Sequence, residues 1–212
     1  TEDLAALEKG IPNLLRHVSN IKNVYKLPCV VAVNRFPTDT DAEIDLVIEK
    51  CRELGVNVAL STVWAEGGKG GIELAEEVVR LCEEPNDFTF SYESELTIAE
   101  KIEAIVKKVY GGDGVDFEPL ALEKLEAYQA DPETAALPVC VAKTQYSLSH
   151  DPKLLGRPRG WRMPVKDVLI YRGAGLVVPV AGEIKLMPGT SASPAYRKID
   201  VDVETGKVKG LF

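Results

Sequence analysis

Hydrophobic and polar positions in the first 82 residues alternate between a helical period and short apolar runs. Apolar residues recur every three or four positions over about 2–23, 39–54 and 71–82, which predicts three helices that each have one apolar face. Between these helices, residues 27–34 and 56–62 are short runs of apolar, often β-branched residues, and we predict strands covered on both faces. Helices that alternate with such strands are typical of a parallel sheet flanked by helices.

The pattern changes twice in the remainder of the chain. After a break at Pro85, apolar residues return to helical spacing over about 94–110 and 118–130, and an apolar run at 137–142 predicts a third buried strand. Beyond residue 143 the helical period is lost, and eight of the 13 prolines lie between positions 132 and 194. Short strands separated by Gly and Pro turns are predicted there, at 165–171, 176–180 and 183–187.

These patterns together predict an α/β fold in two parts. Residues 1–150 are expected to form a mainly parallel, doubly wound sheet flanked by helices, similar to that of P-loop NTPases. Residues 151–212 are expected to form a smaller antiparallel β region. In open parallel sheets, ligands bind beyond the carboxyl ends of the strands. The segments 35–40 and 63–70 have that position, so they are the first candidates for a site.

Composition and charge narrow the function classes. Lys and Arg total 25 against 33 Asp and Glu, a net charge of −8, which does not favour a nucleic-acid-binding face. No apolar run approaches the roughly 20 residues that cross a bilayer, and the polar start of the chain does not resemble a signal peptide. We therefore expect a cytoplasmic protein that binds neither nucleic acid nor membrane.

The cysteines and histidines do not predict a metal or redox site. Cys29, Cys51, Cys82 and Cys140 form no C-x-x-C pair and have apolar neighbours, so we expect buried, reduced thiols. His17 and His150 each lack a second ligand at metal-binding spacing. We therefore expect no bound metal at these residues.

Two aromatic residues follow the first two predicted strands directly. Phe36 and Trp64 would lie at the same edge of a parallel sheet, where two aromatic rings can hold a flat heteroaromatic ligand between them. The glycines at 67, 68, 70 and 71 would let backbone amides approach a ligand or anion closely. The alternative is that both aromatic residues only pack against the protein.

Polar residues near the same strand ends allow other interpretations. Asn34 and Asp39 can be compared with the Asn-Lys-x-Asp base-recognition segment of P-loop GTPases, but they lie five rather than three positions apart. The phosphate-binding pattern G-x-x-x-x-G-K-[ST] does not occur in this sequence. Lys143 follows the third predicted strand, where it either meets a phosphate or carboxylate or is a solvated loop residue.

A longer pattern extends over almost the whole chain. Its segments are Val-Asn-Arg-Phe-Pro-Thr-Asp-Thr (33–40), Trp-Ala-Glu-Gly-Gly (64–68), Cys-Val-Ala-Lys-Thr-Gln-Tyr-Ser-Leu-Ser (140–149), Gly-Ala-Gly (173–175), Met-Pro-Gly (187–189) and Ile-Asp-Val-Asp…Gly-Leu-Phe (199–212). On these segments the chain resembles the carboxy-terminal part of formate–tetrahydrofolate ligase. Members of that family phosphorylate formate with ATP and transfer the formyl group from formyl phosphate to the amine of tetrahydrofolate.

The resemblance implies roles for particular residues. Phe36 and Trp64 match the aromatic residues that stack on the folate pterin, and Pro37, Thr38 and Asp39 match the adjoining wall. Asp39 would accept hydrogen bonds from the pterin, because an ionised carboxylate only accepts. The further residues implied to line the pocket or touch the ligand from loops are Leu60, Gly67, Gly68 and Lys143. Lys69 departs from the small residues expected in the glycine loop.

The resemblance also implies partners outside these segments. In the family an amino-terminal nucleotide-binding domain holds ATP with Mg²⁺, some members use a monovalent cation, and the enzyme is a homotetramer. That domain is not expected within this sequence, and no tightly bound cofactor is implied. Two other interpretations stay open: a stand-alone, non-catalytic folate-binding or assembly module, and the GTPase-like fragment.

Overall fold

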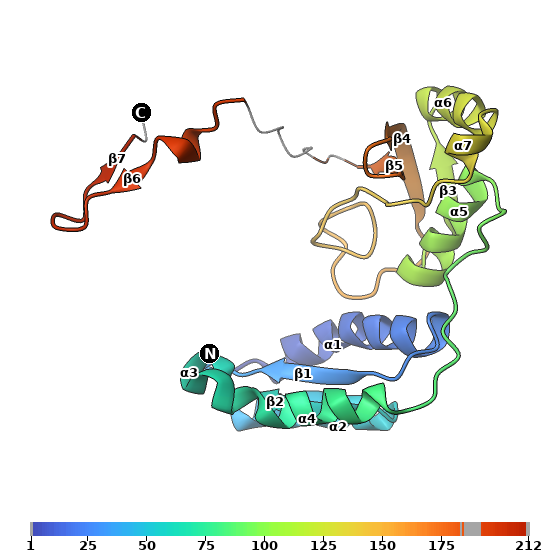
Figure 1. The fold of residues 1–212 in the computed structure, drawn as a ribbon. Coiled ribbons are helices and arrows are strands. Elements are labelled where there is room, and N and C mark those ends of the chain that lie inside the picture. The colour runs from blue at the N-terminus through green and yellow to red at the C-terminus, as the bar shows by residue number, and fades with distance from the viewer. Residues whose placement is uncertain (1, 183, 185–191, 211–212) are drawn as a thin grey trace.

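The computed structural model describes residues 2–182, 184 and 192–210, which form two lobes and a terminal hairpin (Figure 1). Apart from residue 184, the predicted strand at 183–187 lies outside the described residues, as does the Met-Pro-Gly segment at 187–189. The linker between the lobes, residues 83–97, contains no helix or strand.

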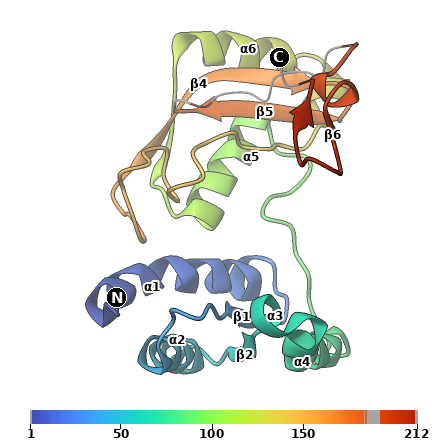
Figure 2. The ribbon, with the colours of Figure 1, turned by 90° about the vertical axis from the view of Figure 1, so that its left-hand side faces the viewer.

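The first lobe is a small parallel sheet surrounded by helices (Figure 2). Its elements are α1 (Leu4–Ser19), η1 (Asn20–Val24), β1 (Val30–Asn34), α2 (Asp41–Glu53), β2 (Asn57–Ser61), α3 (Val63–Glu66), η2 (Gly67–Gly71) and α4 (Ile72–Cys82). One hydrophobic cluster joins α1, the sheet and α2 through Val18, Val31 and Cys51. Helix α4 lies against β2, where Asn57 donates a hydrogen bond to Glu77 at 2.6 Å.

Strands β1 and β2 run parallel and in register, from Val30 opposite Asn57 to Asn34 opposite Ser61. The predicted parallel pairing of these two strands is therefore confirmed. The prediction that both faces are covered is wrong for β1, because Ala32 and Asn34 remain exposed. Their register partners in β2, Ala59 and Ser61, are buried, so on this face the covering is complete at β2 and not at β1.

The second lobe has a three-stranded sheet in the order β3–β4–β5, with β3 parallel and β5 antiparallel to β4. Its elements are α5 (Ile98–Ile105), η3 (Val106–Tyr110), β3 (Gly114–Phe117), α6 (Pro119–Gln129), α7 (Pro132–Ala135), β4 (Arg162–Tyr171) and β5 (Leu176–Ala181). Its core packs Ile102 and Val115 against Val168 and Val177, so the boundary expected near Asp151 falls inside this lobe.

The predicted third buried strand at 137–142 is confirmed only in part: the segment pairs in parallel with β5, but it is not a continuous strand and none of its residues is buried. In the structure only Val139 and Ala142 make isolated bridges, and their partners are Val177 and Val180 of β5. This segment therefore belongs to the second lobe rather than to the sheet of β1 and β2. The α/β class is confirmed, but the described residues form sheets of two, three and two strands instead of one doubly wound sheet.

The lobes contact each other along α1. Arg16 Nε donates to the carbonyl oxygen of Val109 at 3.1 Å, and Asn20 Nδ2 donates to the same oxygen at 2.9 Å. Asn13 Nδ2 donates to the carbonyl oxygen of Gly156 at 2.9 Å. These contacts join α1 to the end of η3 and to the loop that precedes β4.

The described residues after 191 include a short antiparallel hairpin. Strands β6 (Asp200–Val201) and β7 (Val208–Lys209) form the hairpin, and η4 (Ala195–Arg197) precedes it.

Of the four free cysteines only Cys51 is buried, while Cys29 is half-buried. The expectation of buried thiols is wrong for Cys82 and Cys140, which are exposed, because Cys82 ends α4 on its solvent side and Cys140 lies in an irregular surface segment.

Candidate functional site

The carboxyl ends of β1 and β2 lie side by side. Asn34 and Ser61 end the two strands as register partners, and the Arg35 amide then donates to the Ser61 carbonyl oxygen at 2.9 Å. The loops that follow, residues 35–40 and 62–71, therefore start from one edge of the sheet. Residues far apart in the chain are brought together at this edge by the pairing alone.

Phe36 and Trp64 contact each other across the two loops. Their ring centroids are 6.0 Å apart with an angle of 54° between the ring planes, and the residues are 43% and 63% exposed. A flat ligand between parallel rings requires about 7 Å, twice the carbon–carbon contact distance of about 3.5 Å. Binding therefore requires the rings to open by about 1 Å and to turn parallel, a side-chain change that is common at binding surfaces.

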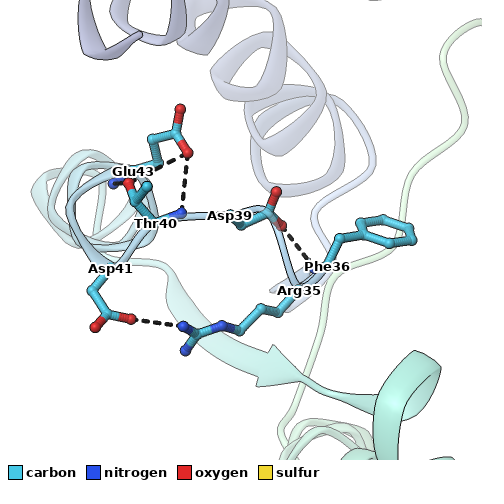
Figure 3. Close-up of polar contacts among 6 residues, drawn as sticks. All are labelled: Arg35, Phe36, Asp39, Thr40, Asp41 and Glu43. Atoms are coloured by element: carbon cyan, nitrogen blue, oxygen red, sulfur yellow. Dashed lines mark hydrogen bonds and ion pairs between the residues drawn. The ribbon is translucent and has the colours of Figure 1, made fainter. Parts of the chain in front are cut away.

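The Phe36 backbone is held by Asp39. The Phe36 amide donates to Asp39 Oδ2 at 2.8 Å (Figure 3). The Asp39 amide donates back to the Phe36 carbonyl oxygen at 3.0 Å. Pro37 and Thr38 form the exposed tip of this turn. One carboxylate oxygen of Asp39 therefore accepts from the Phe36 amide, and within the described residues no hydrogen bond to the other oxygen is found.

The same loop is anchored where α2 begins. Thr40 Oγ1 accepts from the Glu43 amide at 3.3 Å, and Glu43 Oε2 accepts from the Thr40 amide at 3.2 Å, a capping box. These contacts lower the pKa of the Glu43 carboxyl, chiefly because the Thr40 amide stabilises its ionised form. Arg35 also pairs with Asp41 at 2.8 Å, but this exposed ion pair contributes little stability.

The Trp64 loop is held by backbone contacts. The Thr62 carbonyl oxygen accepts from the amides of Ala65 and Glu66 at 3.0 and 2.9 Å, which starts the single turn of α3. The Thr62 amide donates to the Gly70 carbonyl oxygen at 3.0 Å, so the loop closes on its own first residue. Below it, Leu60 is half-buried in β2 opposite Val33.

A family model described as formate–tetrahydrofolate ligase matches residues 1–212. The chain belongs to the formate–tetrahydrofolate ligase family. Curated relatives of that name from Desulfotalea psychrophila, Dehalococcoides mccartyi and Desulfovibrio desulfuricans are each 50% identical to it over 211, 212 and 211 residues, or 100% of this chain. The chain spans 38%, 35% and 36% of the length of these formate–tetrahydrofolate ligases.

Most of the site residues implied by the formate–tetrahydrofolate ligase resemblance lie at this one edge. Phe36, Pro37, Thr38 and Asp39 share the first loop, and Trp64, Gly67 and Gly68 share the second, with Leu60 beneath. Gly67 has a φ of +63°, a left-handed conformation that favours glycine, whereas Gly68 has open space around its α-carbon. Lys69 is exposed at the surface of the loop.

Lys143 is the residue that the structure does not bring to this edge. Its ammonium group donates to the carbonyl oxygens of Thr144, at 2.9 Å, and Ser147, and it lies over the Tyr110 ring at 4.8 Å from the centroid. Burial lowers its pKa, because the charged form loses solvation. The expectation failed because the segment before Lys143 joins β5 in the second lobe instead of the sheet of β1 and β2.

Four supporting residues, Thr40, Glu43, Thr62 and Gly70, were not among the site residues proposed from the sequence. The capping box was detectable, because Thr40-x-x-Glu43 precedes an apolar helical period. The roles of Thr62 and Gly70 were not, because a loop's closure onto itself depends on its three-dimensional path.

The structure also bears on metal binding and on membrane insertion, for the residues that it describes. No three His, Cys, Asp or Glu side chains among them are placed to ligate one metal ion. None of the described helices combines the length and the apolar character that crossing a bilayer needs.

Proposed function

We propose that this chain is the tetrahydrofolate-binding, carboxy-terminal part of an ATP-dependent formate–tetrahydrofolate ligase. The reaction converts formate, ATP and tetrahydrofolate into formyltetrahydrofolate, ADP and phosphate by way of formyl phosphate. The observation that carries the proposal is the exposed Phe36–Trp64 pair at the shared end of two parallel strands. Membership of the ligase family supports it by naming a ligand, tetrahydrofolate, that has a flat pterin ring.

In this proposal the two loops position the nucleophile. The pterin lies between the rings of Phe36 and Trp64, with the second carboxylate oxygen of Asp39 accepting from its polar edge. This holds the folate amine near the carbonyl carbon of formyl phosphate, where the amine attacks and phosphate leaves. Holding two reactants close together in this way lowers the activation barrier by up to about 7–11 kcal/mol in favourable cases.

The remaining steps are assigned to polypeptide outside these residues. In the proposal an amino-terminal domain binds ATP with Mg²⁺, makes formyl phosphate and neutralises the phosphate charge, and the whole enzyme is a homotetramer. In some members a monovalent cation assists. The extra length of the relatives supports this division, since the chain spans 35% to 38% of them.

The experiment is calorimetric titration of the chain with tetrahydrofolate under reducing, oxygen-free conditions. Trp64→Ala and Phe36→Ala should each weaken binding by roughly 1–3 kcal/mol, because each removes one stacking surface. Phe90→Ala is the matched control, because Phe90 is 78% exposed and forms a second aromatic pair with Phe88 in the linker. Unchanged affinity in both site variants would refute the folate assignment.

A second assay separates the enzyme from a non-catalytic module. Formate-dependent release of ADP from ATP is measured for the chain alone and for the full-length enzyme. The proposal expects no release by the chain alone and turnover by the full-length enzyme. Folate binding without turnover by the full-length protein would favour the stand-alone binding or assembly module.

A further inference from the structure

The loop that carries Trp64 is closed by one glycine. Gly70 lies beside Thr62, the residue that follows β2, and its carbonyl oxygen accepts from the Thr62 amide at 3.0 Å. The Thr62 carbonyl oxygen meanwhile accepts from the amides that begin α3. Thr62 therefore joins the start of the loop to its end, and Trp64 lies within the closed segment.

There is no space for a side chain at Gly70. A β-carbon built there would lie 2.4 Å from the carbonyl carbon of Thr62, 2.7 Å from its oxygen and 2.5 Å from its Oγ1. Carbon–carbon contacts are ordinarily about 3.5–4.0 Å. The crowded atoms belong mainly to the backbone of Thr62, which cannot turn aside as a flexible side chain can. Thr62 in turn follows Ser61, whose carbonyl oxygen accepts from the Arg35 amide, so the loop rather than the sheet must move.

The neighbouring glycines are not constrained in this way. A β-carbon on Gly68 would meet nothing within 4 Å, and one on Gly71 would come within 3.0 Å of a Val63 methyl group alone. Gly67 is required for its positive φ, not for a close approach. Within this loop the tight contact with backbone atoms is specific to Gly70.

We propose that Gly70 is a positioning residue that sets the distance between Trp64 and Phe36 without touching the ligand. Any side chain at position 70 pushes the end of the loop away from Thr62 and breaks the hydrogen bond that closes it. Since α3 starts at the same residue, Trp64 moves with the loop and is displaced from its position opposite Phe36. The inference rests on the proposed folate site for its effect on binding, but its effect on Trp64 is independent of any ligand.

The test compares Gly70→Ala with Gly173→Ala in the complete chain. Gly173 lies in the turn between β4 and β5, has no positive φ, and has open space for a β-carbon, so it is the matched control. The first measurement is acrylamide quenching of tryptophan fluorescence without folate. Trp64 is 63% exposed and Trp161 is 6% exposed, so quenching reports mainly on Trp64.

Gly70→Ala should increase quenching and weaken tetrahydrofolate binding roughly tenfold, which corresponds to loss of most of one stacking contact. Gly173→Ala should change neither quantity, and Gly71→Ala should give a smaller effect than Gly70→Ala. Far-ultraviolet circular dichroism and cooperative unfolding should be retained, since the clash is confined to the loop. Unchanged quenching in Gly70→Ala overturns the inference, and so does global unfolding of that variant.

The two proposals can fail separately. A wild-type chain that does not bind tetrahydrofolate refutes the folate site, while the quenching comparison still judges the role of Gly70. In the converse case, the wild type binds tetrahydrofolate with an affinity that Trp64→Ala weakens and Gly70→Ala does not. That result supports the folate site and refutes the role of Gly70 in positioning Trp64 for the ligand.

Discussion

The two loops at the candidate site present similar aromatic residues but are held by different chemistry. The Phe36 loop is fixed by side chains, through the Asp39 carboxylate and the Thr40–Glu43 capping box. The Trp64 loop is fixed by backbone hydrogen bonds and by the close approach of Gly70 to Thr62. A loop held by a side chain tolerates a substitution that keeps the same acceptor, whereas a loop held by close approach tolerates no added atom.

The difference also determines how each loop responds to pH and to substitution. The pKa of the Glu43 carboxyl is lowered by the capping box that anchors the Phe36 loop, so this anchor weakens in acid, while amide–carbonyl contacts at the Trp64 loop do not change charge. One half of the aromatic pair is therefore sensitive to pH and tolerant of conservative substitution. The other half is insensitive to pH and intolerant of any side chain at one position.

Among the substitutions that test this difference between the loops, those at Asp39 are expected to have the largest effect. Asp39→Ala leaves the Phe36 amide without its acceptor, and a hydrogen bond to a charged group contributes about 1.5–3 kcal/mol. Tetrahydrofolate affinity should fall at least roughly tenfold by calorimetry. Asp39→Asn keeps an acceptor oxygen for the Phe36 amide but replaces the second oxygen, which accepts from the pterin in the proposal, with an NH2 donor, so it should recover only part of the affinity.

The ligand-free state distinguishes positioning by Asp39 from direct recognition of the pterin. Acrylamide quenching of Trp64 should change in Asp39→Ala and stay near wild type in Asp39→Asn, because the Phe36–Trp64 contact depends on the turn. If quenching were the same in all three chains while affinity fell in both variants, the carboxylate would act on the ligand alone.

Removing the capping box at Thr40 should have a smaller effect, and a second capping box at Thr97 provides the control. Thr40 caps α2 beside the Phe36 turn, and Thr97 caps α5 in the second lobe with the same pattern, each accepting from an amide at 3.3 Å. Thr40→Ala and Thr97→Ala should each destabilise the fold by about 1 kcal/mol in chemical denaturation. Only Thr40→Ala should also weaken folate binding, by a few-fold. Equal loss of affinity in both variants would mean that general stability, and not the loop, controls the site.

The elements at this site were predictable because their signals are local. Periodicity placed a helix over 39–54 and a strand over 56–62, and the structure has α2 at Asp41–Glu53 and β2 at Asn57–Ser61. Parallel pairing then required both loops to share an edge, so the meeting of Phe36 and Trp64 followed from the pattern. Side-chain period and strand direction were sufficient for this part of the site.

The position of Lys143 shows what local signals miss. An apolar run at 137–142 looks the same whether it joins one sheet or another, because partner choice depends on contacts that are distant in sequence. In the structure this run bridges to β5, and the Lys143 ammonium group donates hydrogen bonds to the carbonyl oxygens of Thr144 and Ser147 in the second lobe. Gly70 is a similar case, since its contact with Thr62 exists only when the loop is closed.

The smallest expected effect is the pH dependence of the Phe36 loop. The pKa of Glu43 is lowered below its ordinary value, mainly because in the folded chain the Thr40 amide donates a hydrogen bond to the ionised carboxylate. A carboxyl whose pKa is lowered by folding stabilises the fold above its unfolded pKa, and this contribution is lost as pH falls through the folded pKa. Glu43→Gln removes the titrating group, so the loss of stability between about pH 5 and pH 3 should be shallower than in the wild type. The measurement is the free energy of unfolding at each pH. Gly70→Ala, which alters the backbone-held loop, should leave the slope in this range unchanged, and a changed slope in that variant would contradict the division between the two loops.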